Sequence, residues 1–254
     1  MLDHEYETMR RVEDTYWWYR VLRALTAAAV ARHFRTDAEA CVLDAGCGTG
    51  GTLETLRHTS ATWRLHGFDY SPLAVAHSKE RGFPDVKSGS VNAMPEHDAA
   101  YDAVVSLDVL CCGGVEVDSA FGEFRRVLKP GGILVLNLPA FPALQGRHDI
   151  AVNSARRFTA ENLHRLLVTH GFELVTLHYW NAWLFLPILA WRQITRIAAR
   201  QHDQGTVESD LFPLPSCVNA ALTCIGWTEA RLCKLVRPPF GTSVFSVARK
   251  QIPP

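Results

Sequence analysis

The chain has 254 residues, enough for one α/β domain with additions but with little room for two complete domains. Hydrophobic residues make up 48% of it, so a large core can be buried and a disordered chain is not expected. Lys+Arg and Asp+Glu balance at 26 each, which gives no electrostatic reason to expect a nucleic-acid partner.

The start of the chain and its cysteines indicate the compartment. The N-terminus, Met1 to Glu5, is polar and acidic, so we expect no secretory signal. The seven cysteines are odd in number and form no Cys-x-x-Cys pair, so neither a disulfide framework nor a metal site is expected. A cytoplasmic protein fits this use of cysteine.

In chain order, the first 40 residues predict two helices that carry the apolar cluster Tyr16-Trp17-Trp18-Tyr19-Arg20. From about residue 41, short apolar strands alternate with amphipathic helices, which is typical of a parallel sheet covered on both faces. The predicted strands are 41–45, 64–68, 84–88, 101–107, 132–138, 172–179 and 243–248. The predicted helices of the core are 49–59, 71–81, 118–129 and 159–170.

A glycine-rich segment, Gly46-Cys47-Gly48-Thr49-Gly50-Gly51, follows the first predicted strand. It satisfies both G-x-G-x-G and the dinucleotide pattern G-x-G-x-x-G, and either way glycine permits a tight turn and close approach of a ligand. A pyrophosphate prefers the bare positive end of a helix. Asp44 instead places a carboxylate beside the loop, which suits the ammonium and sulfonium of S-adenosylmethionine. On this segment alone both cofactors, and a turn without any ligand, remain alternatives.

Asp69 closes the second predicted strand. A carboxylate at that spacing accepts hydrogen bonds from both hydroxyls of a ribose, or it caps the helix that begins near Pro72. Because Ser71 can cap that helix equally well, we interpret Asp69 as a ribose ligand.

Together with later motifs, these residues make the chain resemble the class I S-adenosylmethionine-dependent methyltransferases from Cys41 to about Lys250. The later motifs are Asn92-Ala93, Tyr101 to Asp108 and Leu128 to Gly132. The resemblance implies a seven-stranded, mostly parallel Rossmann-like α/β sheet with helices on both faces. It also implies one domain over 1–254, built from a helical cap (1–40), the core (41–178), a helical substrate-side insertion (179–240) and a last strand and tail (241–254).

The resemblance further implies S-adenosyl-L-methionine as the cofactor, with Asn92 and Ala93 near its adenine and Leu107 and Asp108 under its methionine part. The cofactor-binding residues that we expect are Asp44, Gly46, Cys47, Gly48, Gly50, Asp69, Tyr70, Asn92, Ala93, Leu107, Asp108, Trp17 and Trp18. The two tryptophans form either a lid over the cofactor or a helix packed on the core.

The flanks are similar to an uncharacterised bacterial subgroup of these enzymes with a Trp-Trp-Phe-Arg-like element before the core. After the fifth strand the subgroup has a His-Asp pair, matched here by His148 and Asp149. Two departures are Cys111-Cys112, where the subgroup has Glu-His, and Ser154, where it has histidine. If either histidine is a base in the relatives, this chain lacks it.

The implied reaction is methyl transfer to an O, N or C atom of a small apolar acceptor, such as a secondary metabolite. Its main requirement is alignment of the reacting atoms, worth roughly 7–11 kcal/mol. His148 and Asp149 are the candidate bases, and a plain loop histidine paired to its neighbour is the alternative. Arg156 and Arg157 either clamp an acidic substrate or, as we favour, hold the loop.

Two functions compete with methyl transfer. One is that of a cofactor-binding protein without methyl transfer, such as a regulator or a cyclase, and the other is that of a nicotinamide-dependent dehydrogenase.

The most apolar run of the chain is 179–191, and Arg192, Arg196 and Arg200 follow it at a spacing of four. The run is shorter than the roughly 20 residues that a membrane span takes, and Pro187 interrupts it. We favour the wall of an apolar substrate pocket over a dimer contact or a helix lying on a membrane surface.

Overall fold

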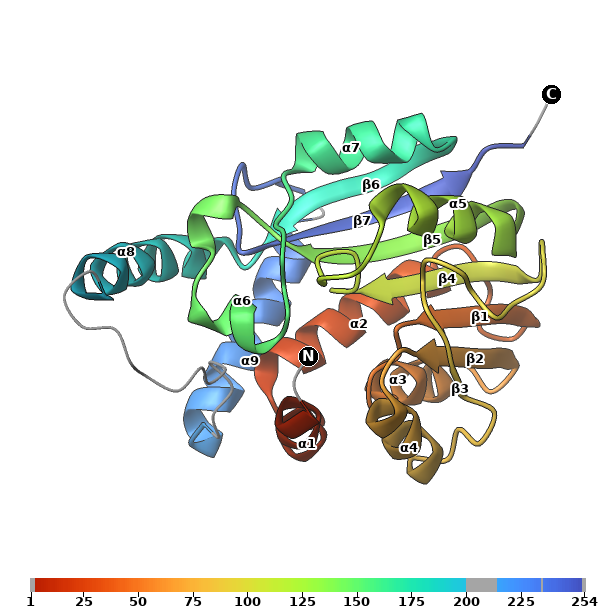
Figure 1. The fold of residues 1–254 in the computed structure, drawn as a ribbon, viewed down its shortest axis with the longest axis horizontal. Coiled ribbons are helices and arrows are strands. Elements are labelled where there is room, and N and C mark those ends of the chain that lie inside the picture. The colour runs from red at the N-terminus through yellow and green to blue at the C-terminus, as the bar shows by residue number, and fades with distance from the viewer. Residues whose placement is uncertain (1–2, 200–213, 234, 253–254) are drawn as a thin grey trace.

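The computed structural model describes residues 3–199, 214–233 and 235–252, and a seven-stranded sheet lies at its centre (Figure 1). The strands are β1 (Ala40–Ala45), β2 (Trp63–Asp69), β3 (Lys87–Ser88), β4 (Tyr101–Leu107), β5 (Leu128–Pro139), β6 (Phe172–Trp180) and β7 (Ser243–Lys250). Their order across the sheet is β3-β2-β1-β4-β5-β7-β6. β1 to β5 run parallel, whereas β7 is antiparallel to both β5 and β6. The predicted fold class is confirmed.

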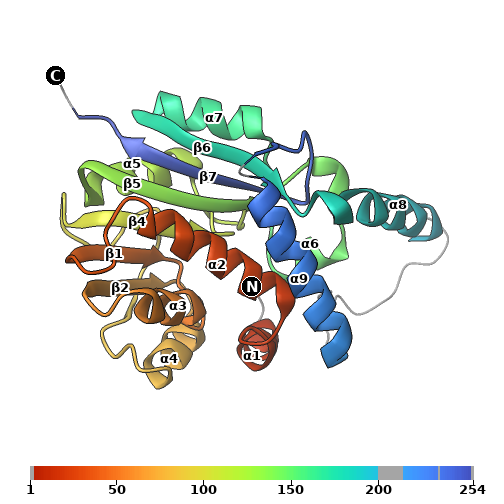
Figure 2. The ribbon, with the colours of Figure 1, turned by 180° about the vertical axis from the view of Figure 1, so that it is seen from behind.

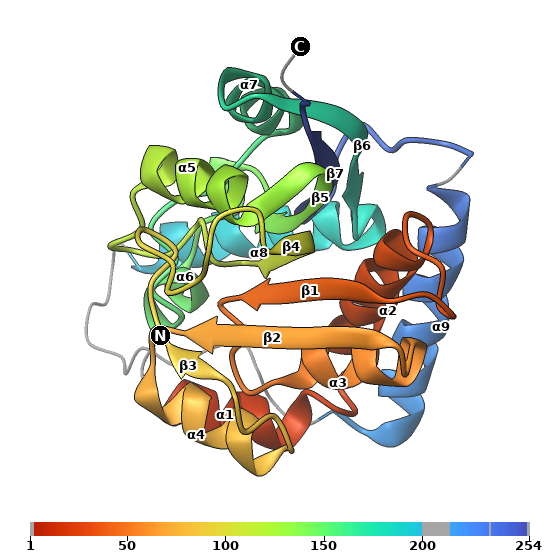
Figure 3. The same ribbon diagram turned by 90° about the vertical axis from the view of Figure 1, so that its right-hand side faces the viewer.

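Helices cover both faces of the sheet. They are α2 (Trp17–Ala31), α3 (Gly51–Thr59), α4 (Pro72–Glu80), α5 (Val117–Val127), α7 (Ala160–Thr169) and α9 (Ser216–Leu232). α2 and α9 lie on one face, and α5 and α7 on the other (Figure 3). The central strands are therefore buried on both sides, and Leu43, Val104 and Leu134 are completely inaccessible.

Two boundaries differ from the predictions by more than two residues. Only Lys87 and Ser88 of the predicted strand 84–88 pair with β2. Pro84 has no N–H to donate to a ladder, and the apolar character of this stretch serves packing, because Val86 is buried in a cluster with Leu53. β5 begins at Leu128 rather than near 132, so α5 ends directly before it at Val127.

The remaining elements lie beyond the carboxyl ends of the parallel strands. They are α1 (Asp3–Val12), the short η1 (Pro142–Leu144), α6 (Arg147–Ala151) and α8 (Ala182–Ala199). The two predicted N-terminal helices are confirmed as α1 and α2, and α9 lies beside α2 (Figure 2). Asn219 of α9 ties the two together, because its Oδ1 accepts the backbone N–H of Trp17 at 2.8 Å.

The predicted apolar segment forms the end of β6 and most of α8, which projects away from the sheet (Figure 1). Within the described residues every helix falls short of the length and apolarity that a membrane span needs. Of the predicted basic stripe, the side chain of Arg196 and all of Arg200 lie outside the part that the structure describes.

Candidate active site

The glycine loop connects β1 to α3 and has the backbone that its sequence requires. Gly46, Gly48 and Gly50 adopt φ values of +89°, +55° and +82°, in the left-handed region that favours glycine. A Cβ at Gly46 would lie only 2.4 Å from a methyl carbon of Val109. The N–H groups of Gly46 and Cys47 donate to the carbonyl of Phe68, so the loop is held against the end of β2.

A cavity of about 1030 Å³ opens at this loop. Its wall combines the carboxyl ends of β1, β2, β4 and β5 with residues from α1, α2, α6 and α8. The predicted residues on its wall are Asp44, Gly46, Cys47, Gly48, Asp69, Tyr70, Asn92, Leu107, Asp108, Trp17, Trp18, His148 and Asp149. Ligand sites in parallel α/β sheets lie at this edge, so one cavity brings together most of the site that we predicted.

Gly50 and Ala93 are predicted cofactor residues that do not line the cavity. Gly50 instead precedes the first residue of α3, where a Cβ would lie 3.0 Å from Ser78 Oγ. The amide of Asn92 is also engaged by the protein, because it donates to the Gly114 carbonyl at 2.9 Å and accepts the Glu116 N–H at 2.9 Å. These contacts hold the loop after β4, and they leave an adenine contact of Asn92 as a prediction.

The Asp69 carboxylate lies between the glycine loop and the start of α4. Its Oδ2 accepts the Gly48 N–H at 2.8 Å, and its Oδ1 accepts the Ser71 N–H at 2.9 Å. Ser71 caps α4 by accepting the Ala74 N–H, as we expected when we interpreted Asp69 as a ribose ligand and not as the cap. The pKa of Asp69 is raised by burial. Asp69 is therefore fixed in position at the cavity wall, as a ribose ligand must be.

Tyr6 of α1 reaches the same carboxylate, with its hydroxyl donating to Asp69 Oδ1 at 3.5 Å. The bond is long, and a ribose hydroxyl could replace it. We therefore expect Tyr6→Phe to change cofactor affinity by no more than the roughly 0.5–1.5 kcal/mol that a single neutral hydrogen bond contributes. Equilibrium dialysis with S-adenosylhomocysteine measures this, and a loss larger than tenfold would show that Tyr6 itself holds the ligand.

Asp44 lies at the floor of the cavity and is 2% exposed. Its Oδ2 makes no hydrogen bond to any described residue. Burial, and to a smaller extent the nearby Asp69, raises the pKa of Asp44 to about 7. A buried carboxylate oxygen without a partner is destabilising unless a donor or a cation meets it. This orphaned oxygen fits a cationic ligand and is unsuited to a pyrophosphate.

A second carboxyl at the cavity, that of the half-buried Asp108, follows β4 with a left-handed φ of +56°. Both of its oxygens accept from Asn137 Nδ2, at 3.1 and 3.0 Å. Asn137 is itself oriented by the Trp180 indole N–H, which donates to its Oδ1 at 2.8 Å. Burial raises the pKa of Asp108 to about 7. The chain Asp108–Asn137–Trp180 thus links the ends of β4, β5 and β6.

Trp17 and Trp18 line the cavity and also pack in the core. The ring of Trp17 lies 5.7 Å from that of Trp183 on α8, and Trp18 stacks on Trp180 at 6.0 Å. Of the two alternatives for this cluster, the packing on the core is seen, and a lid over the cofactor stays a prediction.

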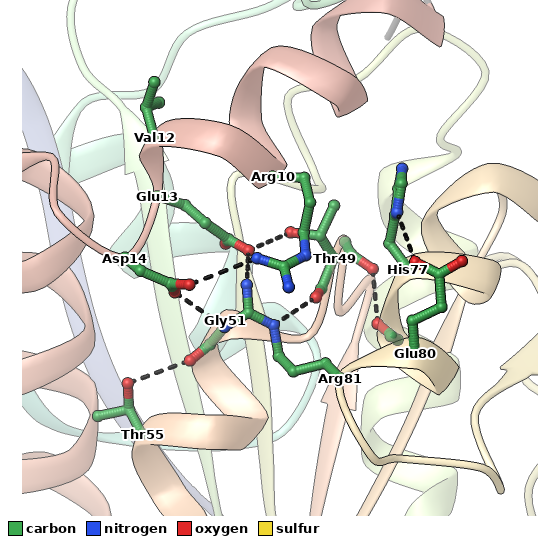
Figure 4. A network of polar contacts seen from close by, with 12 residues as sticks. Arg10, Val12, Glu13, Asp14, Thr49, Gly51, Thr55, His77, Glu80 and Arg81 are labelled. Carbon is green, nitrogen blue, oxygen red and sulfur yellow. Dashed lines mark hydrogen bonds and ion pairs between the residues drawn. The ribbon is translucent and has the colours of Figure 1, made fainter. Parts of the chain in front are cut away.

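A buried ionic network fixes the N-terminal cap to the glycine loop (Figure 4). Glu13 is 2% exposed and accepts hydrogen bonds from Thr49, Arg23 and Arg81. Arg81, the residue directly after α4, also donates from Nε to the Thr49 carbonyl at 2.9 Å. The network joins the turn before α2, the glycine loop and α4, and no sequence motif singled out Glu13 or Arg81.

The loop after β5 carries the two predicted bases. Asp149 is 2% exposed, and both its oxygens are engaged by Arg157, at 3.0 and 3.1 Å, while the Gly146 N–H donates to Oδ2 at 2.7 Å. Arg156 donates to the Val115 carbonyl at 2.8 Å. Both arginines therefore hold the loop, which is the role that we favoured for them. Asp149 therefore orders the loop, and of the pair His148 is better placed to act on a ligand.

Arg157→Lys tests this arrangement. Lysine keeps the charge but loses the two-pronged contact, so we expect the free energy of unfolding to fall by about 1–3 kcal/mol. Arg156→Lys is the matched control, because its single bond to a carbonyl survives the change. Urea denaturation measures both, and an equal loss in the two variants would contradict the structural role of the pair.

Cys111 and Cys112, at the other departure from the subgroup, line the cavity beside Asp108. The thiol of Cys111 donates to the Asp108 carbonyl at 3.1 Å, and Cys111 is buried in the core. Cys111 is thus part of the core and of the cavity wall at once.

Two features define a class of cofactor-binding α/β domains. One is the strand order, in which the antiparallel β7 lies between β5 and β6, and the other is the cavity at the glycine loop. Residues 43–136 match the family described as "Methyltransferase domain". Residues 43–136 are thus a methyltransferase domain, and S-adenosylmethionine is its cofactor.

Known proteins are similar over much of the chain. A Mycolicibacterium smegmatis protein named "Probable S-adenosylmethionine-dependent methyltransferase" is 30% identical over 64% of this chain and 61% of its own length. A 24-methylenesterol C-methyltransferase of Oryza sativa is 32% identical over 37% of the chain and 27% of its own length. The chain thus spans about three fifths or less of these relatives. The crystal structure of the [4+2]-cyclase SpnF has the same fold, with a TM-score of 0.59 and 24% identity over 94% of this chain and 87% of that one.

Proposed function

We propose that the chain transfers the methyl group of S-adenosylmethionine to an O, N or C atom of a small, largely apolar acceptor. The observation that carries this proposal is the single cavity that joins the cofactor loop to an apolar wall on α8, including Leu184 and Ile188. The sterol named for the rice relative is an acceptor of this character.

The cofactor supplies an electrophilic methyl group on a positively charged sulfur. The chain's own residues have three tasks: Asp69 accepts the ribose hydroxyls, Asp44 meets the ammonium, and Trp17 and Trp18 close the cavity against water. The acceptor then lies on the α8 side of Asp108. Alignment of the reacting atoms is the main contribution of such a site.

Where the acceptor must lose a proton, Asp108 is the best placed base. Its carboxylate faces the cavity, Asn137 fixes its orientation, and a pKa of about 7 matches a base that works near neutral pH. His148, which also lines the cavity, is the second candidate. Asp149 is the weakest, because Arg157 and the Gly146 N–H already engage its oxygens.

The test is incubation of the protein with S-adenosylmethionine carrying a labelled methyl group and a bacterial metabolite extract. We expect labelled product that partitions into organic solvent, together with release of S-adenosylhomocysteine. Bound cofactor without either product would favour the second function, a cofactor-binding protein or cyclase without methyl transfer, for which the fold shared with a [4+2]-cyclase is the supporting observation.

The outer face of α8 exposes Leu186, Trp191 and Ile194. Contact of this face with a second copy of the chain or with a membrane surface stays a prediction from the sequence.

A further inference from the structure

One face of α8 forms a continuous wall of the cavity. Asn181, directly before the helix, and Leu184, Ile188 and Arg192 on it all line the cavity. The last three are spaced four residues apart, which places them along one side of the helix. At about 1.5 Å per residue, the wall runs for about 12 Å from Leu184 to Arg192, with Asn181 just beyond its first end. It is therefore long, and polar only at its two ends.

The first end of this wall is an amide in a constrained position. Asn181 is 1% exposed and has a left-handed φ of +59°. Its backbone N–H and that of Ala182 donate to Glu229 of α9, at 3.1 and 2.6 Å. The side-chain Oδ1, however, meets no donor among the described residues. A donor on a ligand would satisfy this buried oxygen, which otherwise destabilises the protein.

This end is also the end near the reaction. Asn181 follows Trp180, whose indole N–H orients Asn137 and through it Asp108. Asn181 and the carboxyl that we propose as the base thus line the same cavity and are connected through Trp180 and Asn137.

The far end of the wall is a buried cation. Arg192 is 8% exposed, and its guanidinium lies against the backbone of Gly146, where a Cβ would come within 2.6 Å of Cζ. Arginine presents five donors in a fork, so it can bind an anion on a ligand in addition to its contacts within the protein. Among the residues that the structure describes, the other charged groups of this half of the cavity are the paired Asp149 and Arg157, which offset each other, and the titratable His148.

We propose that this wall is an acceptor subsite for a long amphipathic anion. The carboxylate or phosphate of the acceptor meets Arg192, its apolar chain lies along Leu184 and Ile188, and its reacting end donates a hydrogen bond to Asn181. The proposal rests on the proposed function and deepens it, because it names the class of acceptor.

Calorimetry on the protein saturated with S-adenosylhomocysteine tests the subsite with three probes of equal chain length, kept below their micellar concentrations. They are dodecanoate, dodecyl phosphate and dodecan-1-ol. We expect at least one anion to bind about tenfold or more tightly than the alcohol, because charge-assisted hydrogen bonds are the stronger class. Tighter binding of dodecanoate assigns a carboxylate source, and tighter binding of dodecyl phosphate assigns a phosphate.

Arg192→Gln should remove this preference for the anion while leaving affinity for S-adenosylhomocysteine unchanged. Gly146→Ala, which keeps every charge but displaces the guanidinium, should reduce the preference and covers the case in which the first variant does not fold. Arg165→Gln, an exposed arginine on α7, is the matched control and should change nothing.

Equal binding of the alcohol and both anions to the wild type, or an anion preference that survives Arg192→Gln, would overturn the proposal. Failure of the subsite leaves cofactor binding and methyl transfer intact. Failure of the proposed function would instead show as an anion preference without transfer of the labelled methyl group.

Discussion

Replacing Asp44 by asparagine is expected to weaken binding of S-adenosylhomocysteine by about 30-fold or more and, at pH 8, to stabilise the protein without ligand. The loss follows because removing one partner of a buried charge pair typically costs about 2–5 kcal/mol. The gain follows because Asp44 is 2% exposed and its Oδ2 has no partner among the described residues. Asp44 thus lowers the stability of the ligand-free protein, and its carboxylate is satisfied only when a cationic ligand binds.

The destabilising effect of Asp44 on the ligand-free protein depends on pH. The folded protein holds the Asp44 proton up to a pKa of about 7, whereas the unfolded chain releases it near 4. Between these values the folded state binds more protons, so this residue's contribution to stability falls as pH rises from about 4 to 7. Thermal unfolding should therefore show a higher melting temperature for Asp44→Asn than for the wild type at pH 8, and nearly equal values at pH 4.5. A variant that is destabilised at pH 8 would contradict this account.

Asp108→Asn is expected to lower methyl transfer by about 10²–10⁴-fold, the usual contribution of a positioned general base. Asparagine has the same shape and can still accept from Asn137, so the fold and the cavity should be preserved. The measurement is the initial rate of label transfer into the metabolite extract, alongside affinity for S-adenosylhomocysteine. The rate should fall far more than the affinity.

Asp102→Asn is the matched control for this change. Asp102 lies near the amino end of the same strand, where it pairs with Lys129 at 2.8 Å, and it does not line the cavity. A rate for Asp108→Asn as high as that of this control would remove Asp108 from the reaction and leave His148 as the candidate. The wild-type rate should also rise with pH through about 7, as Asp108 ionises.

Local sequence patterns were enough to predict most of the fold. Strands that alternate with helices, a glycine loop with Asp44 before it, and Asp69 at the end of the second strand are all properties of short segments, and the structure brings them to one edge of the sheet. The predicted strand 84–88 was too long because apolar residues pack equally well without a ladder. Val86 is buried in this way although it pairs with no strand.

The residues that sequence analysis missed act across long separations. Glu13 contacts Thr49 and Arg81, which are 36 and 68 positions away in the sequence. Asn181 is connected to the site through its neighbour Trp180, which donates to Asn137. A lone glutamate or asparagine in a helical or loop segment has no local pattern that distinguishes it from a solvated one. Only the packing of α1, α2 and α8 over the sheet brings these side chains to the cavity.

We infer that this cavity binds S-adenosylmethionine with its ribose on Asp69 and its cationic end on Asp44. The most direct measurement is calorimetric titration of the wild type and of Asp69→Ala with S-adenosylhomocysteine and, separately, with NADH. We expect S-adenosylhomocysteine to bind at one site per chain, this binding to be lost in Asp69→Ala, and NADH to give no heat. Binding of NADH in place of S-adenosylhomocysteine would contradict this assignment of the cavity.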